Sequence, residues 1–305
     1  MQCNDRGGKV PHVNPPPPRI TRALLSAAGR PTALDTVSKP KVLIDIEGSS
    51  LINHVLRQLH AGGILHVVLV ISRHSAATIL EVELFCECHP NLQVNIVDLT
   101  SEYKGFYAHS LLAAFGHCFQ EGESGVLLAT ADHIFDETLV RDMCHAPLEA
   151  ETQLCVLVDF ATCQFQGLPP TTVGVRCSGS RVEDLSQALG RQIVRGAPRS
   201  ADLGIEAGLF ACTRTIFDRL AAICERCEYF TLSDAMHSMV EEGLVAWRQT
   251  DGRRWIAVET IAELASTRST SVMRSCGSPA STPSMSPSTP GNCRELMPSF
   301  FIGGS

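Results

Sequence analysis

The sequence has no surplus of basic residues and no long apolar run. Lysine and arginine together number 25 against 32 aspartates and glutamates, which gives a formal net charge of −7 at pH 7. A broad basic surface for nucleic acid or for an anionic membrane is therefore not expected. The longest apolar stretches, such as residues 64–71, are too short to span a bilayer. The first residues also lack the charged-then-apolar pattern of a secretion signal, so we expect a cytoplasmic protein without a membrane segment.

Cysteine, by contrast, is abundant, with 13 residues in the chain. A hydrophobic content of 44% is enough for a core that needs no disulfide bonds. The spacings Cys86–Cys88 and Cys224–Cys227 raise zinc as an alternative. Only one residue separates the first two cysteines, and the second pair has no obvious partner pair nearby. We therefore expect reduced thiols and no structural zinc.

The composition changes near both ends of the chain. Residues 1–19 contain four consecutive prolines, and residues 267–305 are rich in serine, threonine and proline. Neither composition can bury enough apolar surface to form a core, so we expect a disordered arm and a disordered tail. The sequence thus predicts one folded domain over residues 20–266.

Within this domain, short apolar runs alternate with segments of helical periodicity. The runs predict strands at 23–26, 66–71, 94–98, 125–129 and 154–160, and the periodic segments predict helices at 51–59, 75–88 and 110–119. This alternation is typical of an α/β fold, here a Rossmann-like, three-layer, mostly parallel sheet with helices on both faces. Ligands of such sheets bind beyond the carboxyl ends of the strands. A hairpin is expected over residues 243–255, beside the ligand.

The first predicted strand runs into a turn of small residues, with lysines a short loop away. Backbone N–H groups in such a turn can hold phosphates, and lysines can neutralise them as point charges. The lysines are Lys39 and Lys41. The residues of the turn are Ala27, Ala28, Gly29 and Arg30.

Another predicted strand ends close to Asp132, which His133 follows. A carboxylate at this edge of the sheet suits Mg²⁺, which usually binds one or two carboxylates together with substrate phosphates. The alternative role for Asp132 is to cap the next helix, but the upstream phosphate turn favours the metal. His133 packs against Asp132 or orients it, and nothing in the sequence makes it a general base.

Several motifs, in order along the chain, resemble those of the nucleotidyltransferases that join a nucleoside triphosphate to a sugar phosphate or polyol phosphate. They include AAGRPTAL at 27–34, PKVL at 40–43, GSSLINHVLRQL at 48–59 and ADHIF at 131–135. HSLLAAF at 109–115 is similar to a helix of the inositol-1-phosphate cytidylyltransferases, the subgroup that the chain resembles most. The segments 205–210, 232–235 and 255–260 complete the series. The resemblance covers nearly all of the predicted domain.

The resemblance implies a role for several residues. Lys41 and Asp132 would be catalytic, and Mg²⁺ would be held by Asp132 and Glu259. A nucleoside triphosphate would bind the turn at 27–30, with Ser110 lining the pocket of the base. Glu206 and Gly208 would contact the second substrate, a phosphorylated small molecule.

The chain also departs from the family pattern at phosphate-facing and metal-facing positions. Pro31 lacks an N–H group, Ala33 replaces an arginine, Thr172 replaces a lysine, and Ala257 replaces an aspartate. Two hypotheses therefore remain. The first is a Mg²⁺-dependent nucleotidyltransferase that favours CTP and releases pyrophosphate. The second is a catalytically impaired relative that binds a nucleotide or metabolite and acts as a regulatory protein.

Overall fold

The structure is a computed structural model that describes residues 19–28, 34, 40–72, 75–99, 107–161, 172–195 and 200–258. Most of the predicted arm and all of the predicted tail lie outside these ranges. So do Gly29, Arg30, Pro31, Ala33 and Glu259.

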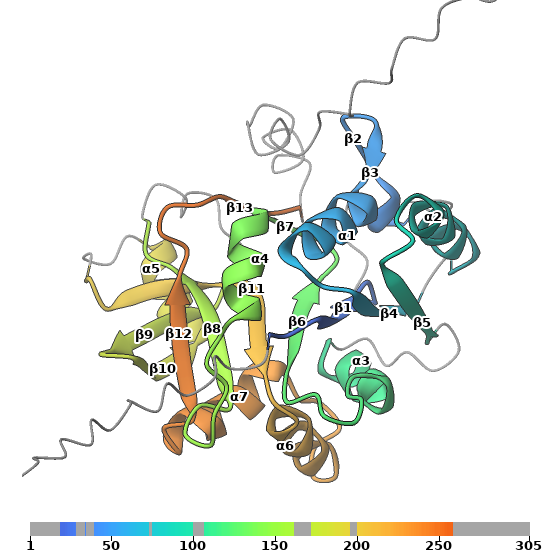
Figure 1. Cartoon of the computed structure of the whole chain (residues 1–305). Helices are drawn as coiled ribbons and strands as arrows, with labels where there is room; N and C mark the ends of the chain where they lie inside the picture. The colour runs from blue at the N-terminus through green and yellow to red at the C-terminus, as the bar shows by residue number, and fades with distance from the viewer. Residues whose placement is uncertain are drawn as a thin grey trace, which may run out of the picture.

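A nine-stranded sheet forms the centre of the described structure, in the order β5-β4-β1-β6-β11-β8-β12-β10-β9 (Figure 1). Its strands are β1 (Arg22–Ser26), β4 (His66–Ile71), β5 (Gln93–Asp98), β6 (Val126–Thr130), β8 (Leu154–Asp159), β9 (Gly174–Ser178), β10 (Arg181–Ser186), β11 (Leu203–Cys212) and β12 (Val245–Gln249). Two small sheets pair β2 (Asp45–Ile46) with β3 (Ser49–Ser50), and β7 (His133–Phe135) with β13 (Trp255–Ala257).

Helices cover both faces of this sheet (Figure 1). They are α1 (Leu51–Gly62), α2 (Ser75–Cys88), α3 (Tyr107–Ala114), α4 (Glu137–Cys144), α5 (Gln187–Val194), α6 (Thr215–Cys224) and α7 (Leu232–Glu241), with short 3₁₀ turns at Lys41–Leu43 and Phe115–His117. Helices α1, α2 and α4 contribute to one apolar cluster, and α3, α6 and α7 contribute to the other.

Strand β1 shows why the central strands read as continuous apolar runs. Ala23 and Leu25 belong to the cluster under α1 and α4, whereas Leu24 belongs to the cluster under α3, α6 and α7. Successive side chains of a strand point to opposite faces, and here both faces are covered. Every residue of β1 is consequently buried. The α/β fold with helices on both faces, predicted from these runs, is confirmed.

The sheet is mixed. Strands β5, β4, β1 and β6 run parallel to one another, as the alternation of strands and helices predicts. β11 is antiparallel to both of its neighbours, β6 and β8, and β9 and β10 form an antiparallel pair. An apolar run carries no information about strand direction, so the mostly parallel arrangement expected from the alternation describes β5, β4, β1 and β6 but not β11, β9 and β10.

The hairpin expected over residues 243–255 is wrong. β12 joins the central sheet parallel to β8, whereas β13 pairs with β7 in a separate small sheet. The chain turns between them at Asp251 and Gly252, which have positive φ angles of 53° and 70°. This turn carries Trp255 away from β12 and over the carboxyl end of β6, where the candidate site lies.

Candidate active site

An ion pair joins the carboxyl end of β6 to the 3₁₀ turn that carries Lys41. Lys41 Nζ lies 2.7 Å from Asp132 Oδ2, and the two side chains are 12% and 19% exposed. The residues belong to separate sequence motifs, 91 positions apart, which the structure brings together. A cation and an anion thus share a half-buried position at the edge where ligands of such sheets bind.

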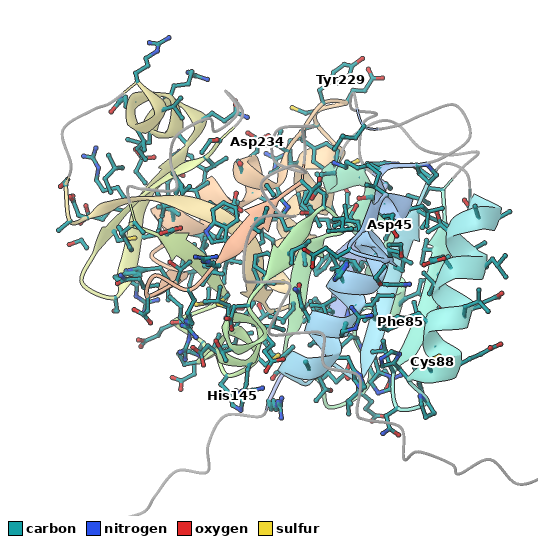
Figure 2. All side chains as sticks on the ribbon, turned by 90° about the horizontal axis from the view of Figure 1, so that it is seen from above. Asp45, Phe85, Cys88, His145, Tyr229 and Asp234 are labelled. Atoms are coloured by element: carbon teal, nitrogen blue, oxygen red, sulfur yellow. The ribbon has the colours of Figure 1, made fainter. Side chains whose placement is uncertain are left out.

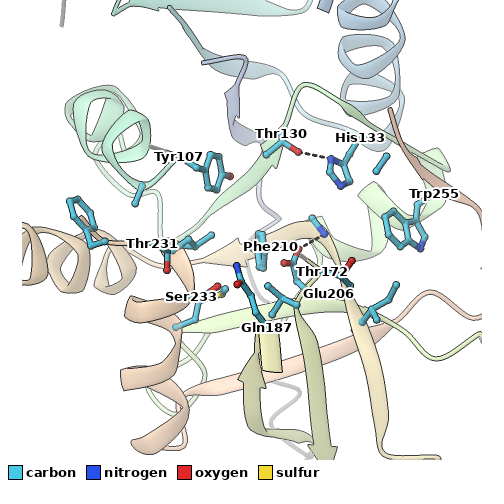
Figure 3. A pocket seen from close by; sticks show the side chains of 18 residues that line it. Tyr107, Thr130, His133, Thr172, Gln187, Glu206, Phe210, Thr231, Ser233 and Trp255 are labelled. Carbon is cyan, nitrogen blue, oxygen red and sulfur yellow. Dashed lines mark hydrogen bonds between the residues drawn. The ribbon is translucent and has the colours of Figure 1, made fainter. Parts of the chain in front are cut away.

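The pKa of Asp132 is set by burial and by two partners. Burial alone raises the pKa of this carboxyl, but His133 and Lys41 more than offset it and hold the pKa well below 3.8. His133 Nδ1 lies 2.7 Å from both Asp132 Oδ1 and Thr130 Oγ1 (Figure 3). Because an ionised carboxylate only accepts hydrogen bonds, Nδ1 of His133 carries the proton that Asp132 accepts. His133 therefore orients the carboxylate.

Strand β13 closes this edge of the sheet. The Trp255 ring stacks nearly parallel to the His133 ring, with centroids 5.9 Å apart and an interplanar angle of 4°. One step further along the chain from Ala257, the Val258 N–H donates to the Asp132 carbonyl over 2.8 Å. The described chain thus reaches Asp132 one residue before Glu259, which itself lies outside the described residues.

Asp159, the last residue of β8, holds the Trp255 side chain through a hydrogen bond. The Trp255 Nε1–H donates to Asp159 Oδ2 over 2.8 Å, and the Ala161 N–H donates to Asp159 Oδ1 over 2.7 Å. Asp159 is fully buried, so these bonds offset the cost of removing its carboxyl from water. Sequence reasoning missed Asp159, although an aspartate at the end of an apolar strand is the same signal that identified Asp132.

Replacing Trp255 with phenylalanine should therefore destabilise the fold. The variant keeps an aromatic ring beside His133 but leaves the buried Asp159 Oδ2 without its indole donor, which costs about 1–3 kcal/mol. Urea denaturation should show this loss in the free energy of unfolding. The double variant Trp255→Phe/Asp159→Asn serves as the control, and an unchanged unfolding midpoint in the single variant would contradict the assigned bond.

A cavity of about 400 Å³ lies beside His133 (Figure 3). Its walls are largely apolar, with a few polar groups, as is usual for small-molecule sites. The Tyr107 hydroxyl is buried, points into the cavity and has no hydrogen-bond partner among the described residues. The polar residues of the lining are Tyr107, Thr130, His133, Thr172, Gln187, Glu206, Thr231 and Ser233.

A bulge in β11 shapes the cavity wall at Glu206 and Gly208. The register against β8 shifts between Glu206 and Phe210, and Gly208 has a positive φ of 80°. A Cβ atom at Gly208 would lie 2.8 Å from His133 Cδ2, so only glycine fits both the backbone and the contact. Burial raises the pKa of Glu206, and the opposing effects of His133 and of the hydrogen bond from the Gly208 N–H offset this increase only in part.

Ala27, Ala28 and Ser110 are the other described residues that were predicted to bind the nucleotide. The Ala27 N–H donates to the Val70 carbonyl over 2.7 Å, and Ala28 is fully buried. Ser110 is also buried, where its hydroxyl lies 3.0 Å from Ser26 Oγ and donates to the Tyr107 carbonyl. Ser110 thus supports the end of β1 and is not among the residues that line the cavity.

Metal ligands are sparse in the part of the chain that the structure describes. It holds no group of three or more histidine, cysteine, aspartate or glutamate side chains placed to bind a metal ion. The same described residues contain no helix long and apolar enough to cross a membrane. Asp132 nevertheless suits Mg²⁺, because it is a half-buried, ionised carboxylate and Mg²⁺ binds few protein carboxylates when phosphates complete its shell.

A lysine is held against a carboxylate, and this carboxylate contacts a histidine in the wall of a small-molecule cavity at the edge of an α/β sheet. This arrangement suits proteins that handle phosphate esters. Comparison with known proteins agrees with this class. Residues 23–224 match the family described as the MobA-like NTP transferase domain, and the chain belongs to that family. The resemblance to nucleotidyltransferases that the motifs indicate is thereby confirmed.

One curated relative is similar to most of the chain. The chain is 28% identical over 244 residues to a bifunctional IPC transferase and DIPP synthase of Rubrobacter xylanophilus, which covers 79% of this chain and 50% of that protein. The chain therefore spans about half the length of this curated relative.

Solved structures share the fold. The inositol-1-phosphate CTP transferase of T. maritima superposes with a TM-score of 0.63 at 14% identity, over 85% of this chain and 96% of that one. A UDP-glucose pyrophosphorylase complexed with UDP-glucose superposes with a TM-score of 0.62 at 13% identity, over 82% and 97%.

Proposed function

We propose that the protein transfers a nucleotidyl group from a nucleoside triphosphate, with CTP favoured, to a phosphorylated polyol or sugar and releases pyrophosphate. The observation that carries this proposal is the contact between Lys41 and Asp132, which are 2.7 Å apart and adjoin His133, a residue of the cavity wall. It supplies a cation for phosphates and an ionised carboxylate at one position. The similarity to a bifunctional IPC transferase and the fold shared with an inositol-1-phosphate CTP transferase support CTP and a polyol phosphate as the substrates.

Mg²⁺ is the metal that fits this proposal. Asp132 would hold it together with Glu259 and the substrate phosphates, and the ion would supply charge neutralisation at those phosphates. The position of Val258, whose N–H donates to the Asp132 carbonyl, supports Glu259 as the second carboxylate.

The residues of the chain would act by positioning and by charge. Lys41 would contact the phosphates of the nucleotide and stabilise the charge that develops on them. His133 would keep Asp132 ionised and oriented. The acceptor would occupy the cavity, where the Tyr107 hydroxyl and Glu206 offer it hydrogen bonds. Because an acceptor phosphate is already anionic, no protein group needs to remove a proton from it.

The test is a pyrophosphate-release assay with Mg²⁺, in which CTP, GTP and UTP are each combined with inositol 1-phosphate and with several sugar 1-phosphates. We expect turnover with one pair, most readily with CTP and inositol 1-phosphate. Absence of pyrophosphate from every pair, with a folded protein, would contradict the proposal.

A noncatalytic binding function is the second candidate. Thr172 and Ala257, which stand where the family pattern has a lysine and an aspartate, both line the cavity, so two charged groups are missing from its wall. Such a protein would still bind a nucleotide or metabolite. Melting temperatures that rise with nucleotide, without any product, would favour this candidate over the enzyme.

A further inference from the structure

The α6–α7 connection carries two exposed cysteines three positions apart, Cys224 and Cys227. The Cys227 N–H donates to the Ile223 carbonyl over 2.9 Å, and the Arg226 N–H donates to the same carbonyl over 3.0 Å. These bonds continue the helical turn past the end of α6. In that geometry the two Cα atoms are about 5 Å apart, within the range of about 4.4–6.8 Å that a disulfide requires.

The other described cysteines lack this combination of exposure and spacing. Cys86 and Cys88 lie two positions apart on α2, so their side chains point to different sides of the helix. Five more cysteines are buried, and burial raises their thiol pKa values, which makes them poor nucleophiles. They are Cys118, Cys144, Cys155, Cys177 and Cys212.

The two exposed thiols border the candidate active site. They line a second cavity of about 370 Å³, and Phe230 lines both this cavity and the one beside His133. Phe230 is itself buried, and the next residue, Thr231, caps α7 and also lines the larger cavity. Only two residues, Glu228 and Tyr229, separate Cys227 from Phe230, so a change in the turn is transmitted directly to this shared wall.

We propose that Cys224 and Cys227 form a reversible thiol–disulfide pair that controls the Phe230 wall of the active-site cavity. With hydrogen peroxide as the oxidant, the sulfur of one thiolate attacks a peroxide oxygen and the O–O bond breaks, which gives a sulfenic acid and a hydroxide ion. The hydroxide takes up the proton that the thiol had released to solvent and becomes water. The second thiol then attacks the sulfenic sulfur, the S–S bond forms and a second water leaves. A dithiol reductant restores both thiols by exchange.

Oxidation changes the local geometry because a disulfide brings the Cβ atoms closer than a helical turn does. Neighbouring Cβ atoms at this spacing are about 5–6 Å apart, whereas a disulfide holds them at about 3.8 Å. The exposed turn must tighten, and Phe230 moves with it. The effect on substrates rests on the proposed function, whereas the formation of the bond does not.

The experiment treats the purified full-length chain with hydrogen peroxide and maps disulfides by mass spectrometry without reduction. We expect the peptide that contains both cysteines to lose the mass of two hydrogen atoms, and dithiothreitol to restore it. In the oxidised protein we expect the KM for the acceptor to rise about 3- to 30-fold with kcat changed less, since a misplacement of about 1 Å can cost up to about 100-fold. Nucleotide- and acceptor-induced shifts in melting temperature provide the same readout if there is no turnover.

Single variants supply the controls. Cys224→Ser and Cys227→Ser should each retain the basal activity and lose the response to peroxide, whereas Cys86→Ser/Cys88→Ser should respond like the wild type. Figure 2 shows Cys88 at a distance from Tyr229, which lies in the α6–α7 connection. Failure of the Cys224–Cys227 bond to form in the folded protein would overturn the proposal. A bond that forms without changing KM or ligand-induced melting shifts would overturn its control of the cavity.

Discussion

Replacing Asp132 with asparagine is expected to lower the rate of pyrophosphate release by about 10³-fold or more. Asparagine has nearly the same shape, so the packing around β6 is retained while the negative charge is lost. The variant would lose both the carboxylate proposed to hold Mg²⁺ and the partner of Lys41. The measurement is kcat with the substrate pair that the assay panel identifies, over a range of Mg²⁺ concentrations.

Asp218→Asn provides a matched control for this change. Asp218 lies on α6, where its carboxylate is 64% exposed and forms an exposed ion pair with Arg214. The same loss of charge there should leave the rate within about twofold of the wild type, because exposed ion pairs contribute little. Turnover that survives in Asp132→Asn would remove this carboxylate from the mechanism.

A feature of this site could be predicted from the sequence only where one short segment of the chain carries the pattern that indicates it. The strand at 66–71 and the helix at 75–88 agree with β4 and α2 residue for residue, because a short continuous apolar run favours a strand buried on both faces and the longer segment after it favours a helix. Lys41 and Asp132 were each identifiable from their own motif. Their contact was not, since 91 positions separate them and no local pattern encodes such a distance.

The features of the site that the sequence did not predict depend on contacts between distant segments of the chain. The support of Trp255 by Asp159 requires β8 and β13 to meet, although β13 belongs to another sheet. The contact between Gly208 and His133 similarly requires a bulge in an antiparallel strand whose direction the sequence does not reveal. Ser110 illustrates the reverse case, because its motif resembles the family pattern while its buried side chain contacts Ser26 and is not among the residues that line the cavity.

The structure shows where two of the residues that depart from the family pattern lie. Thr172 and Ala257 both line the cavity, whereas Lys41 and Asp132 form an ion pair next to His133, another residue of its wall. Separate binding measurements with a nucleotide and with a phosphorylated acceptor would show which of the two proposed substrates these replacements affect.

Replacing Lys41 with methionine is the second substitution with a large expected effect. Methionine retains the apolar part of the side chain, which is only 12% exposed in the wild type, but supplies no charge. Removal of one group that stabilises developing charge typically costs about 10²- to 10³-fold in kcat, and we expect a loss of this size. Lys41→Arg keeps the charge and serves as the control, with a smaller loss because a planar guanidinium replaces a compact ammonium.

The same variant should also change how stability depends on pH. Lys41 and His133 hold the pKa of Asp132 below 3.8, so in the wild type this carboxylate stabilises the fold at all pH values above that range, and its contribution disappears as the pH falls through the lowered pKa. Without Lys41 the pKa depression is smaller and burial still opposes ionisation. The gap in melting temperature between wild type and Lys41→Met should therefore be widest above about pH 5 and should narrow as the pH falls below about 4. A gap that stays constant from pH 7 to pH 3 would mean that the Lys41–Asp132 pair does not set the ionisation of this site, and it would separate a role of Lys41 in substrate binding from one in the electrostatics of Asp132.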